Sequence, residues 1–420
     1  MTTNIVNLSD VVRRPLVDAT GDRIGRIEDV VVRLGDYPHP PVVGLVVRIG
    51  GRDLFVPAGK FSALDQRPVQ FEGRRIDLRK FERREGEILL AKDLLARHLI
   101  NFVGGRLIRA NDVLLASLDG IYEVVAVDPG RRPFLRRIFR GRIADGVSHS
   151  GVVDFASIVP FVSHIPTAKL RIPYRKLSRL HPAQIADLVE AASHDEGEEI
   201  IEAVGEDLEL EADVFEELDM EHQLEFLDSR SDPEAARLLE RMDSDDAADL
   251  ITEVEQARRL SILDLLPEPQ QQKVRNLLAY NPETAGGIMS PDYVAVSDSA
   301  TVAEALAAVK SSEAPNETLN VVFVVNQHDR LEGAAAIASL VRAEESDSIV
   351  SVAQSESAHV HANWDLNRVA RQMSDFNLTV VPVVDTEHER LLGVVTIDDL
   401  IELLLPQGWR REFGMATNEE

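Results

Sequence analysis

The spacing of apolar residues divides the chain into regions with different periods. Up to about residue 75, apolar and polar residues alternate in short runs, as at 24–34 and 42–49, between Gly- and Pro-containing breaks. A period of two is typical of strands that bury one face. Gly50 and Gly51, between the runs 42–49 and 53–56, favour a tight hairpin turn. We therefore predict a small β-barrel over residues 1–80.

The strand pattern returns about 84 residues further along the chain. The stretch GDRIGRIEDVVV, which begins at Gly21, is echoed by GRLIRANDVLLA, which begins at Gly105, and the run 42–49 is echoed at 122–127. An internal repeat means two copies of one structural unit. We expect a second, weaker copy over 81–145, then a Pro-containing linker over 146–176 with a last strand or two.

From residue 177 the apolar residues recur at intervals of three and four, which indicates amphipathic helices. One helix should begin at Pro233 with Asp232 as its N-cap. The sequence EELD at 216–219 is echoed by ERMD at 240–243, so successive helix pairs are similar and should stack into a superhelix. The predicted helices lie at 180–192, 196–204, 212–218, 221–227, 233–242, 245–254, 257–266 and 269–280, within a domain over 177–284.

From residue 285 strand and helix patterns alternate, and the alternation occurs twice. We predict a paired α/β module over 285–405 and a tail over 406–420. The predicted fold class is therefore multidomain α+β: small β-barrels, then an all-α superhelical domain, then the paired α/β module. The predicted strands lie at 294–297, 320–325, 331–333, 360–362, 378–385 and 390–396, with helices at 301–310, 365–373 and 397–405.

Charge is distributed unevenly along the chain. Residues 1–180 hold 30 Lys and Arg against 20 Asp and Glu, whereas the remainder holds 15 against 52. An acidic field attracts divalent cations and repels nucleic acid. Because aromatic residues, which stack on bases, make up only 5% of the chain, a nucleic-acid partner is disfavoured.

The composition also bounds the compartment and the chemistry. The chain has no Cys, which excludes disulfides and thiolate chemistry and fits a reducing compartment. No run approaches the roughly 18 apolar residues of a membrane-spanning helix, and the first residues lack a signal-peptide core. There is no Gly-rich phosphate loop, nucleophile elbow or HExxH. We predict a cytoplasmic protein that is neither a channel nor an enzyme.

A cluster of carboxylates opens the helix predicted at 245–254. Asp245 and Asp249 are four residues apart and therefore share one helix face. Like charges at this spacing repel, so the cluster has a cost. It can serve as a helix start, with Asp243 or Ser244 as cap, or it can bind a hard cation such as Mg²⁺. Spacing alone leaves both interpretations open.

The motifs around this cluster resemble a known family. MDSDDAADL, then AYNPETAGGIM, then the two-copy α/β region, are similar to the cytosolic part of the MgtE magnesium channel family over about residues 177–405. The resemblance implies a CBS pair at 285–405 and Mg²⁺ that closes the helical domain onto it. The ligands that it implies are Asp213, Asp245, Asp249, the carbonyl of Gly287, Asp365, Asp399 and Glu402.

The chain departs from the family pattern in two places. Asn377 stands where the family has an acid, and Gln407 and Arg410 stand where carboxylates lead to a plug helix and the pore. The sequence thus predicts a Mg²⁺ sensor without a pore of its own. A subunit of a two-chain magnesium channel is an alternative.

The second CBS copy also carries a nucleotide-binding pattern. In CBS clefts, a Gly-h-h-Ser/Thr-x-x-Asp sequence holds the ribose of adenosine nucleotides, and this chain has Gly393, Thr396 and Asp399 at those places. The first copy has Ala336 and Ser339 instead of the polar partners. The resemblance implies that Thr396 and Asp399 bind an adenosine nucleotide, in competition with a metal at Asp399. A nucleotide sensor is therefore a second hypothesis.

The N-terminal half supports a third hypothesis, a scaffold. GDRIGRIEDVVV, followed by VVGLVV and VPAGKF, resembles the PRC-barrel family, which implies an adaptor. The stretch 131–142 would form a basic amphipathic helix with a packed face, and it could dock on the acidic part of the chain, on an anionic membrane surface or on a partner such as a membrane transport protein. Its basic residues are Arg132, Arg136, Arg137 and Arg140.

We therefore predict a cytoplasmic, Mg²⁺-responsive regulatory protein that is a homodimer through its CBS pair. The inner face of the membrane is a second location, if the basic stretch binds there.

Overall fold

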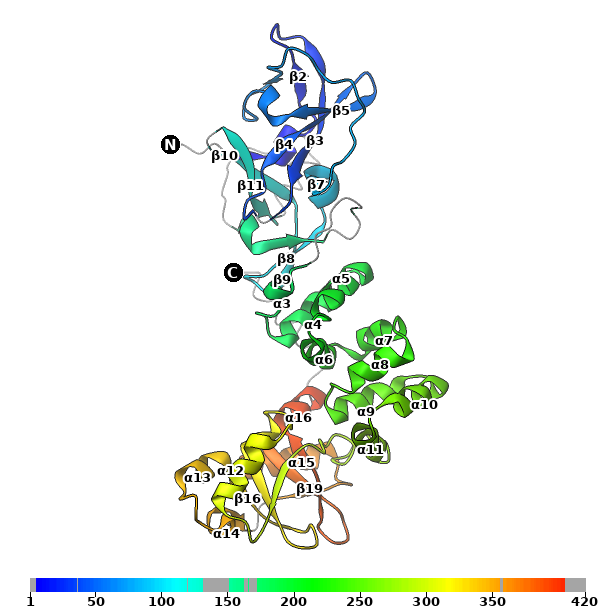
Figure 1. Ribbon diagram of the computed structural model, residues 1–420, viewed down its shortest axis with the longest axis vertical. Helices are drawn as coiled ribbons and strands as arrows, with labels where there is room; N and C mark the ends of the chain where they lie inside the picture. The colour runs from blue at the N-terminus through cyan, green and yellow to red at the C-terminus, as the bar shows by residue number, and fades with distance from the viewer. Residues whose placement is uncertain are drawn as a thin grey trace. The chain divides into compact units, whose positions relative to one another are not determined.

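The computed structural model describes residues 5–35, 37–118, 120–130, 151–161, 165, 172–355 and 358–404. It consists of two compact units, Met1–Asp219 and Met220–Glu420, which are described separately. The first unit holds the strand-rich region and helices up to α6; the second holds α7 onward and the paired α/β module (Figure 1). This order of elements confirms the predicted fold class.

Strands of the first unit form sheets of order β5-β4-β3-β2-β6, with β7 also on β3, then β1-β10-β11-β12, and β13-β8-β9. The hairpin predicted around Gly50 and Gly51 is confirmed, because both glycines have positive φ between β4 and β5. The strands are β1 (Ile5–Asn7), β2 (Pro15–Val17), β3 (Arg23–Arg33), β4 (Val42–Ile49), β5 (Arg52–Pro57), β6 (Val69–Gln70), β7 (Glu87–Leu89), β8 (His98–Asn101), β9 (Arg106–Arg109), β10 (Asp112–Leu118), β11 (Ile121–Asp128), β12 (Val153–Asp154) and β13 (Ile158–Pro160).

The two sequence repeats exchange their first strands. Strand β1 of the first repeat pairs with β10 of the second, and β7 of the second pairs with β3 of the first. Asp29 accepts hydrogen bonds from the backbone of Ala91 and Lys92 in the opposite repeat, at 2.7 and 3.0 Å. Asp112 reciprocally accepts one from the backbone of Ser9, at 3.0 Å. The repeats are therefore interlocked through buried carboxylates.

One hydrophobic core runs through both repeats. Its members extend from Val6 in the first repeat to Ile165 beyond the second. Strand β12 pairs with β11 and β13 with β8, so these are the last strands expected within 146–176. The basic stretch 131–142, with Arg132, Arg136, Arg137 and Arg140, lies outside the described residues.

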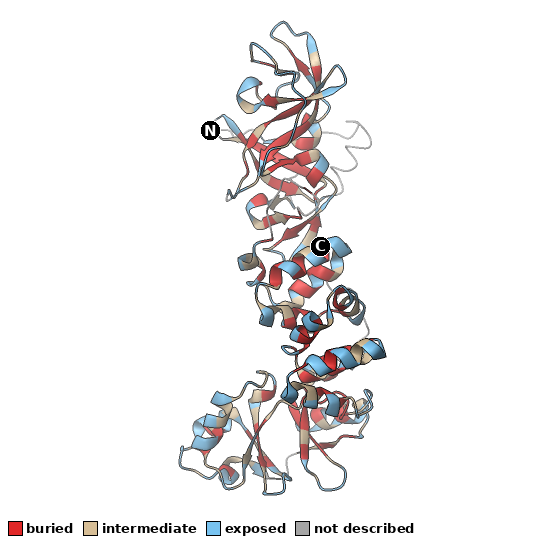
Figure 2. Cartoon of the chain, turned by 45° about the vertical axis from the view of Figure 1, so that its right-hand side comes forward, coloured by how far each residue is buried: buried red, intermediate tan, exposed pale blue. Residues whose placement is uncertain are grey.

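Short amphipathic helices follow, each with one buried and one exposed face (Figure 2). The predicted N-cap at Asp232 is wrong by one residue. Ser231 caps α8 in a reciprocal capping box with Glu234, and Asp232 is the first helical residue. The helices are α3 (Tyr174–Leu177), α4 (Pro182–Ala191), α5 (His194–Val204) and α6 (Leu208–Glu216) in the first unit, and α7 (Met220–Asp228), α8 (Asp232–Leu239), α9 (Ser244–Glu253), α10 (Gln256–Leu265) and α11 (Glu268–Leu277) in the second.

The paired module has two similar copies. In each copy one strand runs parallel to the first strand of an antiparallel hairpin: β14 with β15–β16, and β18 with β19–β20. The hairpin turns of the two copies bind each other, because Leu331 N–H donates to Glu389 O and Leu391 N–H donates to Asp329 O. The elements are β14 (Val294–Ser297), α12 (Val302–Ser311), β15 (Val321–Val325), β16 (Leu331–Ala336), α13 (Ile337–Arg342), α14 (Ile349–Val352), β17 (Gln354–Ser355), β18 (Val360–His361), α15 (Leu366–Phe376), β19 (Val380–Val384), β20 (Leu391–Thr396) and α16 (Ile397–Leu404).

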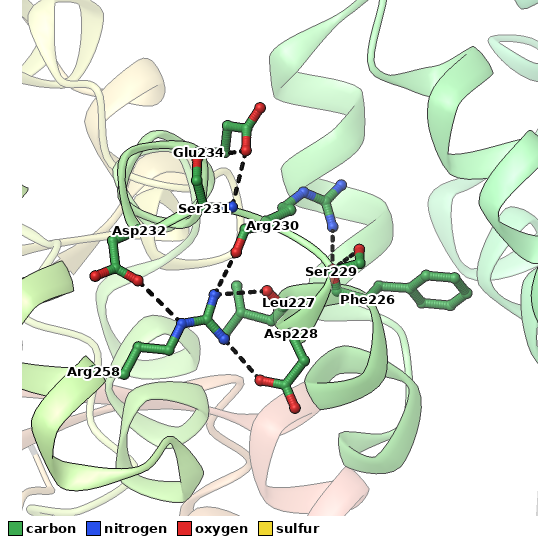
Figure 3. A network of polar contacts seen from close by, with 9 residues as sticks. All are labelled: Phe226, Leu227, Asp228, Ser229, Arg230, Ser231, Asp232, Glu234 and Arg258. Atoms are coloured by element: carbon green, nitrogen blue, oxygen red, sulfur yellow. Dashed lines mark hydrogen bonds and ion pairs between the residues drawn. The ribbon is translucent and has the colours of Figure 1, made fainter.

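One arginine fastens α10 to the turn between α7 and α8 (Figure 3). The guanidinium of Arg258 donates to the carboxylates of Asp228 and Asp232 at 2.7 and 3.1 Å. It also donates to the carbonyls of Leu227 and Arg230, at 2.9 and 2.7 Å. A planar fork of donors can satisfy four acceptors at once, which an ammonium group cannot.

We expect Arg258→Lys to weaken this turn by about 2–3 kcal/mol, because carbonyls in a half-buried turn lose their donors. Hydrogen exchange of the amides at 227–232 would measure the loss. Arg275→Lys is the matched control, since Arg275 makes one exposed ion pair with Asp264 and should change stability by less than about 1 kcal/mol. Equal effects of the two substitutions would contradict the role of Arg258.

Candidate functional site

Residues 284–289, with the sequence TAGGIM, connect the end of the helical region to the second copy of the α/β module through backbone hydrogen bonds. The N–H groups of Ala285 and Gly286 donate to the carbonyls of Trp364 and Ala362, both at 2.8 Å. At Gly287 a Cβ would lie 2.2 Å from the carbonyl oxygen of Asn281, so a larger residue does not fit. The glycine is thus required by close backbone packing, and its carbonyl as a metal ligand stays a prediction.

A polar network holds the start of α9 against the α/β module. The hydroxyl of Ser244 donates to Asp292 at 2.9 Å and lies 3.3 Å from the side-chain oxygen of Gln270, and Lys273 forms an ion pair with Asp292 at 2.5 Å. Asp243 is the N-cap of α9 but makes no capping hydrogen bond with its side chain. A capping hydrogen bond therefore does not account for Asp243, while Asp245 and Asp246 in the first turn interact favourably with the helix dipole.

Asp245, in the same first turn of α9, has an unfavourable environment for its negative charge. Its Oδ1 atom is shielded from solvent and accepts no hydrogen bond from any residue that the structure describes. Burial raises the pKa of Asp245 well above its ordinary value, and the charges of Asp246, Asp399 and Asp243 raise it further. A buried carboxylate that faces other carboxylates needs a proton or a cation to offset its charge.

Asp399 lies in the first turn of α16, and its charge acts on Asp245 of α9. It accepts a hydrogen bond of 2.6 Å from the hydroxyl of Thr396, a buried residue at the end of β20. Burial raises the pKa of Asp399, and nearby Asp398 and Glu317 act in the same direction, while the Thr396 hydroxyl opposes them. The N–H of Asp399 donates back to the Thr396 hydroxyl at 3.3 Å, so the two residues form a reciprocal cap at the start of α16, and their nucleotide role stays a prediction.

Asp249 lies one turn along α9 from Asp245. Partial burial, with a contribution from Glu253, raises its pKa to about 6. By its accessible surface Asp249 is nevertheless exposed, so solvent screening reduces the effect of its charge on stability. Asp245, Asp249 and Asp399 each offer an oxygen ligand of the type that Mg²⁺ prefers. The three do not form a group of ligand atoms within 4.8 Å of one another, so a cation that joined them would do so partly through water.

The other predicted ligands are placed differently. Asp365 caps α15 by accepting from the N–H of Arg368 at 3.1 Å, so a local structural role accounts for it. Asp213 is exposed on α6 of the first unit. Glu402 belongs to α16, and its side chain lies outside the described residues. For these three residues a ligand role stays a prediction.

Asn377 stands where the family has an acid, and its backbone conformation explains why an asparagine suits this position. It follows α15 in the left-handed region, with φ of 53°. Asn tolerates this conformation better than most other residues.

Sequence reasoning missed Asp292, Lys273 and Gln270. Their contacts with Ser244 and with each other join positions between 19 and 48 residues apart. No periodicity or local spacing connects such positions.

The geometry defines a class of protein: a helical domain whose acidic first turn packs on a paired CBS-type module. Residues 180–283 match the family model described as the MgtE intracellular N domain, and residues 349–406 match that of the CBS domain. Residues 180–283 are thus similar to an MgtE intracellular N domain and residues 349–406, the second copy of the paired module, to a CBS domain.

Curated relatives agree with this assignment. The chain is 33% identical over 196 residues to the magnesium transporter MgtE of Thermus thermophilus and 28% identical over 193 residues to that of Bacillus subtilis. Each alignment covers 46% of this chain and 43% of the relative, so the chain spans less than half the length of these relatives.

Two solved structures are similar to more than half of the chain. One is the soluble part of a magnesium transporter, with 25% identity, a TM-score of 0.50, and coverage of 55% of this chain and 90% of that chain. The other is the cytosolic domain of the Mg²⁺ channel MgtE in complex with ATP, with 29% identity, a TM-score of 0.51, and coverage of 55% and 93%. Within the described part of the chain, no helix is both long and apolar enough to cross a membrane.

We expect Asp245→Asn to remove part of the pH dependence of unfolding of the second unit. Raised pKa values mean that the protonated carboxyls stabilise the fold. That contribution is complete below the ordinary value of 3.8 and is lost as pH rises through about 6 for Asp249 and through the raised pKa of Asp245. Calorimetry in EDTA should show a melting temperature at pH 7.5 that is about 3 °C or more above wild type, and no difference at pH 4.

Glu255→Gln removes an exposed carboxylate from the start of α10 and should leave the pH dependence unchanged. If Asp245→Asn, like Glu255→Gln, left the pH dependence of unfolding unchanged, the charge of Asp245 would not destabilise the fold.

Proposed function

We propose that this chain is a Mg²⁺-responsive regulatory module in which the cation joins α9 to α16. The observation that carries the proposal is the Oδ1 atom of Asp245, buried without a hydrogen-bond donor among the described residues and within the electrostatic reach of Asp399. The similarity to proteins described as magnesium transporters supports Mg²⁺ as the cation.

The response follows from repulsion between like charges. Without a cation at neutral pH, Asp245 and Asp399 repel each other across the contact between α9 and α16, and the contact is weakened. Mg²⁺ bound directly or through water replaces this repulsion by attraction. A shift of the population from 1:99 to 99:1 requires about 5.5 kcal/mol of differential binding, which several weak sites can supply together.

The remaining predicted ligands extend the proposal. The resemblance adds Asp213, Asp365, Glu402 and the carbonyl of Gly287 as further Mg²⁺ ligands. The same resemblance leads us to propose a cytoplasmic homodimer through the CBS pair, which passes its state to a membrane transport protein. No catalytic step is assigned to any residue.

An adenosine nucleotide is a second candidate ligand. Its support is the hydrogen bond between Thr396 and Asp399 at the end of β20, together with the solved relative in complex with ATP. Asp399 would then bind either ribose or metal, so nucleotide and Mg²⁺ would compete for it.

We expect Mg²⁺ at 100 times its Kd to stabilise the second unit by about 2.7 kcal/mol. Calorimetry would measure the rise in melting temperature, and hydrogen exchange should slow at the starts of α9 and α16. Asp245→Asn combined with Asp399→Asn should abolish both effects, whereas Glu255→Gln should preserve them. Mg²⁺ that leaves the wild type unchanged, or stabilises the double variant equally, would refute the proposal.

For the nucleotide, we expect AMP without Mg²⁺ to stabilise the second unit and Thr396→Val to weaken this effect by about tenfold in Kd, because a charge-assisted hydrogen-bond network is lost. Titration calorimetry checks this. Ser351→Ala, a hydroxyl loss on α14 away from β20, is the control. If AMP bound the Thr396→Val variant as tightly as the wild type, its binding site would not include Thr396.

A further inference from the structure

A cavity of about 540 Å³ lies in the first unit, at the first of the two repeats. Three arginines contribute to its wall, against a single carboxylate. Its volume falls within the range of about 300–1,000 Å³ that is typical of small-molecule sites. The lining residues are Ser9, Asp10, Arg14, Pro15, Val17, Arg23, Arg67 and Pro68.

The wall offers more hydrogen-bond donors than the protein uses. Arg14 donates through Nη1 to the carbonyls of Leu64 and Gln66, at 2.6 and 3.3 Å. Its Nε and Nη2 atoms make no hydrogen bond with any described residue. Arg23 likewise pairs with none of the described residues. Since a guanidinium has five N–H donors, the cavity presents a surplus of donors.

The positive charge is also poorly compensated. Arg67 has one ion pair in the cavity, with Asp10 at 3.6 Å, and both side chains are largely exposed. Burial and the neighbouring charge of Arg67 lower the pKa of Arg14, so the two guanidinium groups oppose each other, while Asp10, Asp65 and Tyr122 act in the opposite direction and compensate the charge in part. An anion placed between them would relieve that repulsion and accept the free donors.

We propose that this cavity binds the phosphoryl group of a small anionic molecule. Guanidinium forks match phosphate oxygens two at a time, and three arginines suit a dianion with three outward oxygens better than a planar carboxylate. Pro15, Val17 and Pro68 form an apolar wall for the rest of the ligand. The carbonyl contacts of Arg14 give it a structural role as well, whereas Arg23 has no such role.

The test uses the full chain without Mg²⁺, in EDTA at constant ionic strength, with inorganic pyrophosphate as the probe in titration calorimetry. Saturable binding is expected, and R23Q/R67Q should weaken it at least about tenfold, because two charge-assisted contacts are lost. R74Q/R75Q is the matched control, since it removes two exposed arginines that do not line the cavity. Absence of saturable binding, or equal weakening in both variants, overturns the proposal.

A second experiment distinguishes two sources of the phosphoryl group, a lipid headgroup and a free phosphorylated molecule. Phosphatidylcholine vesicles with and without phosphatidic acid are tested for binding and for competition with pyrophosphate. Binding to the acidic vesicles that pyrophosphate displaces, and that R23Q/R67Q loses, supports the cavity with a lipid headgroup as its ligand. Pyrophosphate binding without vesicle binding supports it with a free phosphorylated molecule.

Circular dichroism of R23Q/R67Q at the assay temperature checks that the fold is kept. If R23Q/R67Q were unfolded, the single variant Arg23→Gln would replace it, because the Arg23 side chain makes no hydrogen bond or ion pair with a described residue and its backbone pairing with Val17 does not depend on the side chain. It should weaken pyrophosphate binding several-fold.

Discussion

The second unit depends on one unfavourable contact, the approach of Asp245 on α9 to Asp399 on α16. Each carboxylate is partly or fully removed from water, and the charge of Asp399 raises the pKa of Asp245. The Oδ1 atom of Asp245 has no donor among the described residues. Because the charges oppose each other at this place, the pair is sensitive to any cation or proton that reaches it.

Those neighbouring contacts are backbone pairing and a polar network. The N–H groups of Ala285 and Gly286 fix the end of the helical domain to the second CBS copy. Ser244, Lys273 and Asp292 fix the start of α9 to the segment that precedes the first copy. The carboxylates thus lie between the backbone pairing at Ala285 and Gly286 and the polar network at Ser244. A cation that neutralises them would strengthen contacts that already exist and would not need to create new ones. This is the physical basis on which a weakly bound cation could change the state of the module.

The strand-rich region shows the same dependence on contacts between distant segments. Its repeats exchange β1 and β7, and the buried carboxylates of Asp29 and Asp112 each bind backbone N–H groups of the opposite repeat. Neither repeat can complete its sheet or satisfy these carboxylates alone. The boundary between residues 80 and 81 therefore separates two sequence repeats within one core.

The sequence by itself determined the order of elements and most of the acidic positions. Periods of two and of three to four come from local geometry, so they predicted β3, β4, the helices from α4 to α11 and the two CBS copies within a few residues. The spacing of Asp245 and Asp249 likewise marked one helix face as acidic. Tertiary structure decided the rest. It brought Asp399 within reach of Asp245 and added Asp292 and Lys273 to the site. These outcomes depend on contacts between residues far apart in the chain, which no local pattern encodes.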